Sequence, residues 1–223
     1  METGRLSTNP GDGYQGYRTR LVETLQSKGI RDLGVLNAIS QVPRHLFVPE
    51  SVRHQAYDDV ALPIGAGQTI SQPWVQAKYL ESLGLKGHEA VLEVGTGSGY
   101  QTALLARLAE RVFTVDRVAT LAERARAVLN TFGYRNITVL VGDGTLGWRS
   151  CAPYDAILVS AASPSVPRPL LEQLSPNGRL VIPLGDREMQ VLTIIERRPD
   201  DTYHSTTLGD VRFVPLIGEH GFQ

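Results

Sequence analysis

One short stretch of the sequence carries a carboxylate followed by three glycines at alternate positions. Glu93 lies in an apolar run that begins at Ala90, and Gly95, Gly97 and Gly99 follow it. A helical pattern starts directly afterwards. The order strand, tight turn, helix predicts the first βα unit of a doubly wound sheet, where a nucleotide-like ligand lies against the backbone. A side chain at a glycine position would block either the turn or the ligand.

The spacing of the glycines limits the ligand. A dinucleotide-binding turn requires G-x-G-x-x-G, but Tyr100 stands at its last position, and the Lys of a phosphate-binding P-loop is absent. The Glu93 carboxylate would repel a pyrophosphate and suits a ligand with an ammonium group. The pattern acidic-x-Gly-x-Gly-x-Gly resembles motif I of the class I methyltransferases, which implies S-adenosylmethionine as the cofactor.

Two further acidic residues follow apolar runs of the same kind. Asp116 ends the run 112–116 and lies about twenty residues after Gly97, the separation typical of a carboxylate that accepts both ribose hydroxyls. Its alternative role is to cap a helix over residues 118–132. Asp143 lies in a Gly-Asp-Gly turn. The class I pattern would place it at the adenine amine, and a plain turn is the alternative.

A loop with little burial pattern precedes the glycine turn. It runs from Leu62 to Pro73, and a helix over residues 74–83 is predicted to follow. Loops held between rigid elements often carry functional sites. A serine near a helix N-terminus is more often a cap, however, so the local pattern at Ser71 favours a capping role.

The periodicity of the chain predicts the elements that position these residues. Alternating strands and helices predict a parallel sheet, and two consecutive late strands predict an antiparallel edge. The result is a single α/β domain over residues 15–223. Its helical cap and substrate loop span 15–84, its doubly wound, mostly parallel seven-stranded sheet spans 85–223, and residues 1–14 are expected to be disordered. Strands are predicted at 90–94, 112–116, 137–141, 154–160, 178–183, 191–196 and from about 205 to 214, and the main helices at 17–28, 74–83, 101–109, 118–132 and 167–174.

Composition narrows the classes of function. The formal net charge of the 223 residues is -1, which offers no electrostatic attraction for nucleic acid or an anionic membrane. No apolar run approaches the roughly 18 residues of a membrane span, and no signal peptide is predicted. The single cysteine, Cys151, excludes an internal disulfide, so we expect a cytoplasmic protein in which this thiol is incidental. The five histidines show no metal-ligand spacing, so no metal is expected.

Several segments together resemble the protein-L-isoaspartate O-methyltransferases, in order over about residues 17–217. The loop Gly67-Gln68-Thr69-Ile70-Ser71-Gln72-Pro73 is the most diagnostic, whereas the glycine motif alone identifies only the superfamily. The other matching segments are 42–49 (VPRHLFVP), 92–100 (LEVGTGSGY), 142–144 (GDG), 178–183 (GRLVIP) and 212–216 (RFVPL).

The resemblance implies transfer of the sulfonium methyl of S-adenosylmethionine to the free α-carboxylate of L-isoaspartyl residues in damaged proteins and peptides. S-Adenosyl-L-homocysteine is the other product. The methyl ester then closes to a succinimide, whose hydrolysis returns some normal aspartate. Because a carboxylate is already ionised at neutral pH, no strong general base is required. In-line positioning of the reacting atoms can therefore supply most of the catalysis.

The resemblance also assigns roles to residues, and it reverses the local interpretation of Ser71. Ser71 would be the catalytic residue and hydrogen-bond the substrate carboxylate, with Val214 and Leu216 also binding the substrate. Trp74 and Ile217 depart from the residues common in the family, which puts affinity in doubt but not the reaction. The implied cofactor-binding residues are Gln68, Thr69, Ile70, Ser71, Glu93, Gly95, Thr96, Gly97, Ser98, Gly99, Asp116, Arg117, Asp143, Gly144 and Ile217.

Three other functions are weighed against this one. A methyltransferase of the same fold could act on a small molecule or RNA, but the neutral charge argues against RNA and the diagnostic loop against both. A binding protein that has lost transfer is disfavoured by the intact Ser71, Glu93, Asp116 and Asp143. A dehydrogenase is disfavoured by the glycine spacing. We expect a monomer.

Overall fold

Seven strands form the central sheet of the computed structural model, which describes residues 13–223. Their order is β5-β4-β3-β6-β7-β8-β9; β3 to β7 run parallel, and β8 and β9 form an antiparallel edge. The mostly parallel seven-stranded sheet is thereby confirmed. Residues 1–14 were expected to be disordered, and residues 1–12 of this segment lie outside the described part of the chain. The strands are β3 Ala90–Val94, β4 Arg111–Asp116, β5 Ile137–Val141, β6 Tyr154–Val159, β7 Leu174–Gly185, β8 Gln190–Arg197 and β9 Tyr203–Val211.

The middle of the sheet is covered on both faces. Every residue of β3 is buried, as expected for a parallel strand between helical layers. Alternate residues of neighbouring strands enter two separate apolar clusters. Val91 and Ala156 pack with the N-terminal helices, whereas Leu92 and Ile157 pack on the opposite face, toward α6 (Arg168–Glu172). The twofold period of the strands therefore builds two cores.

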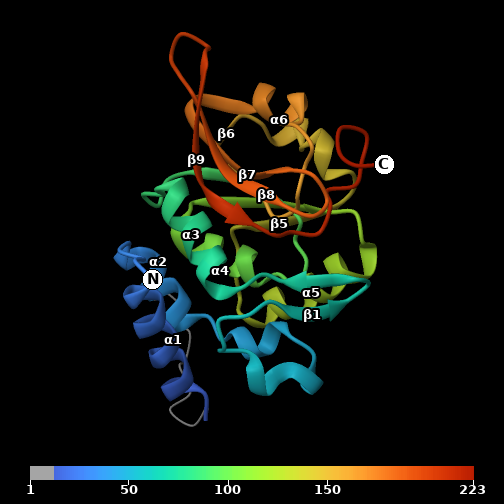
Figure 1. The fold of residues 1–223 in the computed structure, drawn as a ribbon. Helices are drawn as coiled ribbons and strands as arrows, with labels where there is room; N and C mark the ends of the chain where they lie inside the picture. Colours follow the sequence, from blue (N-terminus) through green and yellow to red (C-terminus); the bar gives the residue numbers. More distant parts are fainter. Residues whose placement is uncertain (1–12) are drawn as a thin grey trace.

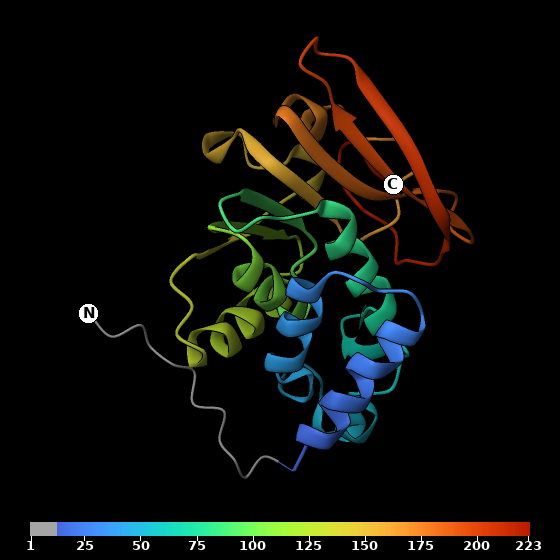
Figure 2. The same cartoon turned by 90° about the vertical axis from the view of Figure 1, so that its left-hand side faces the viewer.

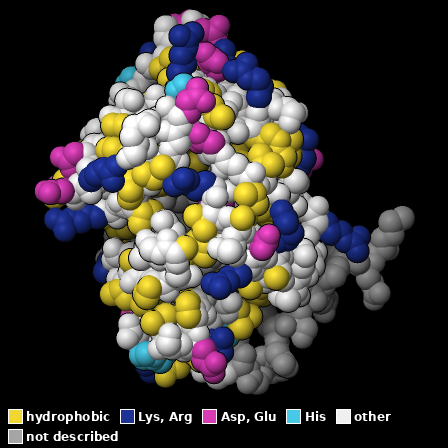
Figure 3. Space-filling view, turned by 90° about the vertical axis from the view of Figure 1, so that its right-hand side faces the viewer, with side chains coloured by type: hydrophobic (Ala, Val, Ile, Leu, Met, Phe, Trp, Pro, Cys, Tyr) yellow, Lys and Arg dark blue, Asp and Glu magenta, His cyan; other side chains and the backbone are white. Residues whose placement is uncertain are grey.

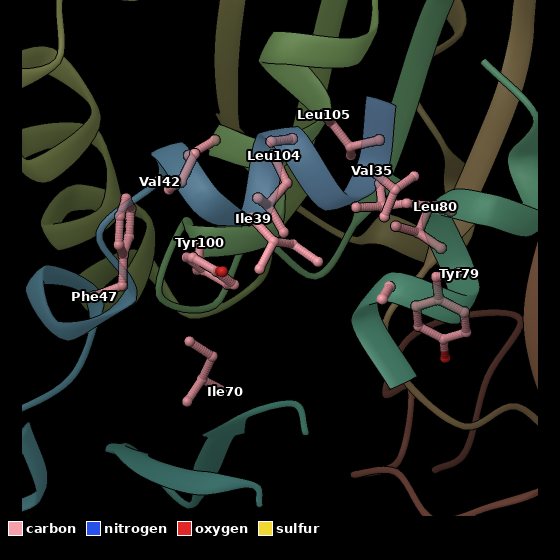
Figure 4. Close-up of a cluster of buried hydrophobic side chains, with 14 of the residues drawn as sticks. Val35, Ile39, Val42, Phe47, Ile70, Tyr79, Leu80, Tyr100, Leu104 and Leu105 are labelled. Carbon is pink, nitrogen blue, oxygen red and sulfur yellow. The ribbon is translucent and has the colours of Figure 1, made fainter. Parts of the chain in front are cut away.

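The N-terminal cap packs on one face of the sheet (Figures 1 and 2). Asp32 caps its second helix, because a carboxylate oxygen accepts from the Val35 N–H at 3.0 Å. Apolar side chains of the cap, such as Ile39, meet Leu104 and Leu105 of the helix after β3 (Figure 4). The cap comprises α1 Gln15–Ser27, α2 Leu33–Gln41, the 3-10 helices η1 Arg44–Phe47 and η2 Glu50–Gln55, and α3 Pro73–Leu83.

A short hairpin that the sequence pattern did not predict lies before α3. Strands β1 (Leu62–Gly65) and β2 (Gln68–Ile70) pair antiparallel within the segment expected to be a loop. Gly65, Ala66 and Gly67 have φ values of 95, 52 and 69 degrees, which close a tight turn. The strands have only four and three residues, too few to show a clear alternation of apolar and polar positions, so the sequence pattern does not predict their pairing.

The remaining helices connect the strands, with two corrections. The helix predicted for residues 167–174 is the shorter α6, because β7 begins at Leu174. The last strand ends at Val211, not at 214. Beyond Val211 the chain leaves β8, and the Val214 carbonyl accepts a hydrogen bond from the Ala162 N–H at 2.8 Å instead. The other helices are α4 Tyr100–Leu108, α5 Ala119–Thr131, η3 Gly144–Leu146 and η4 Arg149–Cys151.

The surface agrees with the nearly balanced charge of the sequence. Lys and Arg side chains are interspersed with Asp and Glu on the face that Figure 3 shows. Among residues 13–223, none of the helices combines the length and apolarity needed to cross a membrane.

Candidate active site

The glycine turn joins β3 to α4 in a conformation that favours glycine. Gly95, Gly97 and Gly99 have φ values of 98, 53 and 85 degrees, where side chains are disfavoured. A Cβ at Gly97 would lie 3.5 Å from the Ile64 side chain, so the β1–β2 hairpin lies against this turn. The predicted order of strand, turn and helix is confirmed.

Gly99 is expected to be the least replaceable of these glycines for folding. A Cβ there would lie 3.0 Å from Ala125 Cβ of α5 while the backbone stays at positive φ. We expect Gly99→Ala to lower the free energy of unfolding by about 2–4 kcal/mol, measured by denaturant titration. The matched control is Gly16→Ala, where nothing lies within 4 Å in helix α1. It should be neutral or slightly stabilising, and an equal loss in both variants would contradict this account.

A cavity opens where β3, β4, β5 and β6 end. It encloses about 870 Å³ of empty space, part of it open to solvent. Most of the residues proposed from the sequence line it, and they come from the hairpin, the glycine turn, the ends of β4 and β5, and the C-terminal segment. These are Gln68, Thr69, Ile70, Ser71, Gly95, Thr96, Gly97, Ser98, Asp116, Arg117, Gly144, Val214, Leu216 and Ile217. Glu93, Gly99 and Asp143 are not among the lining residues.

Asp116 both holds the glycine turn and lines the cavity. It is 8% exposed, and its two carboxylate oxygens accept from the N–H groups of Gly97 at 2.7 Å and Val118 at 2.8 Å. The second bond goes to the N-cap residue of α5 (Ala119–Thr131), just before the helix, and no side chain caps that helix, so the alternative role of Asp116 as a helix cap is wrong. Asp116 does line the cavity. Each oxygen retains a lone pair for a ribose hydroxyl.

Glu93 lies beneath the glycine turn, with no exposed surface. One carboxyl oxygen accepts from the hydroxyls of Thr102 at 2.5 Å and Thr114 at 2.7 Å, and the other has no partner within the described residues. Burial raises the pKa of Glu93 to about 8, although both threonine hydrogen bonds favour the charged form. Its proposed contact with the cofactor stays a prediction that the cavity lining does not support.

The raised pKa of Glu93 predicts a pH-dependent stability. In the folded chain the carboxyl keeps its proton up to a pKa of about 8, whereas in the unfolded chain it ionises near its ordinary pKa of 4.5. The stabilisation that the protonated carboxyl contributes is fully present below the pKa of the unfolded chain. It is lost as the pH rises from there through the pKa of the folded chain. Relative to Glu93→Gln, the free energy of unfolding should fall between about pH 5 and pH 8, by up to about 1.4 kcal/mol per pH unit. Urea titrations of both proteins over this range test it, and parallel curves would contradict it.

Asp143 holds the C-terminal segment. One oxygen accepts from the N–H and hydroxyl of Thr145, and the other accepts from the Glu219 N–H at 2.8 Å. A Cβ at Gly218 would lie 2.1 Å from the carboxylate, so the segment approaches it closely. The neighbouring Gly144 lines the cavity, whereas the contact of Asp143 with an adenine amine stays a prediction.

Ser71 does not cap α3. The helix begins at Pro73, and Asp59 accepts from the Trp74 N–H at 2.8 Å and the Gln72 amide at 3.0 Å. This carboxylate therefore takes the role that the local pattern gave to Ser71. The Ser71 side chain is half-buried and lines the cavity.

A buried arginine fixes the Ser71 backbone. Arg44 has no exposed surface; its guanidinium donates to the Ser71 carbonyl at 2.7 Å and to Gln76 Oε1 at 2.5 Å, and lies over the Tyr100 ring at 4.9 Å. Burial lowers the pKa of Arg44 to about 10, so the side chain remains charged at neutral pH. The sequence shows Arg44 only as part of the segment Val42–Pro49, with no sign of its partners.

A second hollow meets the first at Ser71. It encloses about 1060 Å³, part of it open to solvent. Four residues line both spaces: Thr69, Ser71, Ser160 and Val214. The rest of its wall comes from α3, the turn between β7 and β8, the end of β9 and the segment after it, including Trp74, Val75, Met189, Asp210, Val211, Arg212 and Phe213. Two ligands bound in the two hollows would therefore meet beside a serine hydroxyl.

Sequence reasoning missed some of the lining residues. Gln76 and Gln101 are buried polar residues inside helices, where the helical period marks them only as inward-facing. Ser160 is the last residue of the strand predicted at 154–160, and its place at the end of a parallel strand was the available signal. Within residues 13–223, no group of three or more His, Cys, Asp and Glu side chains is arranged to hold a metal ion.

Proteins with similar sequences and similar folds are known. The protein-L-isoaspartate O-methyltransferase 1 of Syntrophobacter fumaroxidans is 55% identical over 211 residues, covering 94% of this chain and 98% of the relative. A solved protein-L-isoaspartate O-methyltransferase superposes with a TM-score of 0.83 at 28% identity, covering 92% of this chain and 67% of the other. A Plasmodium falciparum structure, described as a protein-L-isoaspartate O-methyltransferase in complex with S-adenosyl-L-homocysteine, gives 0.79 at 28% identity, covering 90% and 98%.

The sequence model of one family matches almost all of the described chain. That family is described as protein-L-isoaspartate(D-aspartate) O-methyltransferase (PCMT), and the match covers residues 16–221. The chain belongs to the protein-L-isoaspartate(D-aspartate) O-methyltransferase family.

Proposed function

We propose that the chain transfers the methyl group of S-adenosylmethionine to the free α-carboxylate of L-isoaspartyl residues in damaged proteins and peptides, with Ser71 at the point of transfer. The observation that carries the assignment of the site is the meeting of two hollows at Ser71. One is built from the glycine turn and Asp116, and the other opens beside Trp74 and Phe213. A methyl donor and a large acceptor require two such spaces in contact.

The first cavity fits the methyl donor. Its wall is formed by the hairpin, the glycine turn and the ends of β4 and β5. Asp116 offers carboxylate oxygens for ribose hydroxyls, and the buried amide of Gln101 has no protein partner in the described chain. When bound, S-adenosylmethionine supplies a methyl group activated by a positively charged sulfur. The residues proposed to hold it are those of the cavity wall, from Gln68 to Ser71, Gly95 to Ser98, and Asp116, Arg117, Gly144 and Ile217.

The second hollow receives the acceptor. The Ser71 hydroxyl donates a hydrogen bond to the isoaspartyl carboxylate. This bond orients one carboxylate oxygen toward the first cavity. Because the carboxylate is ionised at neutral pH, Ser71 need not act as a base. Arg44 holds the Ser71 carbonyl from behind, so the hydroxyl is presented on a fixed backbone. Catalysis then rests on keeping the reacting atoms in line at about 3–3.5 Å.

The segment around Val214 forms one wall of both spaces, but its backbone is largely engaged. The Val214 carbonyl accepts from Ala162, and the Leu216 N–H donates to Ala162 at 2.7 Å. Strand-like pairing of a substrate with these two groups would have to displace Ala162. Val214 is therefore proposed to contact the acceptor through its side chain, while Leu216 lines only the donor cavity.

The reaction is tested with labelled S-adenosylmethionine and two synthetic peptides that differ only in Asp and isoAsp. Base-labile methyl ester on the isoAsp peptide alone is the expected result. Label on neither peptide, with cofactor binding intact by calorimetry, would favour another acceptor or a binding protein without transfer. The expected cytoplasmic location and monomeric state stay predictions, and size-exclusion chromatography with light scattering tests the second.

A further inference from the structure

One buried side chain in the donor cavity has no partner. Gln101 is 5% exposed and lines the cavity, yet neither its amide oxygen nor its amide nitrogen makes a hydrogen bond within the described chain. Leaving such a group unpaired is costly, so most buried polar atoms have partners. An unpaired amide that lines a ligand cavity therefore points to a ligand.

The other buried glutamines of the described chain show that this is not their ordinary state. Gln173 accepts from the Trp148 N–H and donates to the Leu146 carbonyl. Gln190 likewise uses both ends of its amide, and Gln76 accepts from Arg44. Only Gln101 of these four has both amide atoms buried and unbonded.

The order of the strands indicates which part of the donor lies near Gln101. Along the open edge the sheet runs β5-β4-β3-β6. Gly144 and Asp116, after β5 and at the end of β4, mark the adenosine side, and Ser160 after β6 marks the side where the acceptor hollow begins. Gln101 follows β3, between the two, in the first turn of α4. The sulfur and the amino-acid end of the donor lie on this side of the ribose.

We propose that Gln101 binds the amino-acid end of the methyl donor. Its amide oxygen accepts from the α-ammonium, and its amide N–H groups donate to the α-carboxylate, because a primary amide supplies both functions. Gln76 on α3 supports the same end: its oxygen is taken by Arg44, which leaves its N–H groups for the carboxylate. This role rests on the proposed function.

Two ligands that differ only in the amino-acid end test the proposal. S-Adenosylhomocysteine carries it, whereas 5′-methylthioadenosine keeps the adenosine and the thioether but lacks it. By calorimetry, Gln101→Leu should bind S-adenosylhomocysteine about 10- to 100-fold more weakly than wild type, with methylthioadenosine affinity unchanged within about twofold. Gln101→Met, an unbranched side chain of similar length, should behave alike, and thermal unfolding checks that both variants fold.

Two results would overturn the role of Gln101. Unchanged affinity for both ligands would mean that the amide binds water only, and an equal loss for both would mean that it shapes the cavity. Binding of S-adenosylhomocysteine by wild type tests the proposed function separately, and its absence would overturn both.

Discussion

Replacing Ser71 with alanine is expected to lower kcat/KM for an isoaspartyl peptide about 10- to 150-fold. The magnitude corresponds to the loss of one hydrogen bond to a charged carboxylate, about 1.5–3 kcal/mol. Ser71 lines both hollows and does not cap α3, so its hydroxyl remains for the acceptor. Affinity for S-adenosylhomocysteine should change less than about threefold, because the backbone of the loop and its bond to Arg44 persist.

Ser82, on the helix α3 that follows Ser71, provides the matched control. Its hydroxyl donates to the Lys78 carbonyl and lies outside both hollows. Ser82→Ala should leave kcat/KM near wild type. The measurement is the initial rate of methyl transfer over a range of peptide concentrations, with calorimetry for the cofactor product. Near-normal turnover in Ser71→Ala would remove Ser71 from the transfer step.

Asp116→Asn is expected to weaken S-adenosylhomocysteine binding by about 10- to 100-fold. Both carboxylate oxygens accept from backbone N–H groups, Gly97 on one side and Val118 on the other. An amide must point its NH₂ at one of these donors, which breaks a charge-assisted hydrogen bond and disturbs the glycine turn. It also removes an acceptor for the ribose. Methylthioadenosine has the same ribose, so its affinity should fall in parallel, unlike the pattern expected for Gln101→Leu.

Asp155 separates this local effect from a general loss of stability. Its carboxylate accepts from the Ala90 N–H at 2.9 Å and the Ser175 hydroxyl at 3.0 Å, near the opposite ends of the strands. Asp155→Asn loses a similar hydrogen bond, but ligand affinity should stay at the wild-type value. Calorimetry with both ligands, together with thermal unfolding, gives the comparison. Undiminished binding in Asp116→Asn would exclude a ribose contact.

Local patterns in the sequence determined the architecture and the kind of ligand. Apolar runs separated by helical periods predicted the central strands β3 and β6, because a strand buried on both faces is apolar at nearly every position. The alternate glycines after β3 predicted the turn, because positive φ is a property of the residue itself. The 68–73 loop identified the family, and it does line the cavity.

Tertiary packing alone decided which carboxylates and amides face a ligand. Glu93 and Asp143 stand at expected positions in the sequence. The threonines of α4 and β4, however, donate hydrogen bonds to Glu93, and the C-terminal segment donates one to Asp143. Arg44 and Ser71 lie 27 residues apart, and no pattern in either segment records their hydrogen bond.

Gln101 has an inward-facing position that the helical period predicts, but the absence of a partner is a property of everything around it. The backbone conformation of the glycine turn follows from the residues at those positions, so the sequence determined it. The partners of a buried polar side chain come from distant segments, so only the folded structure decided them.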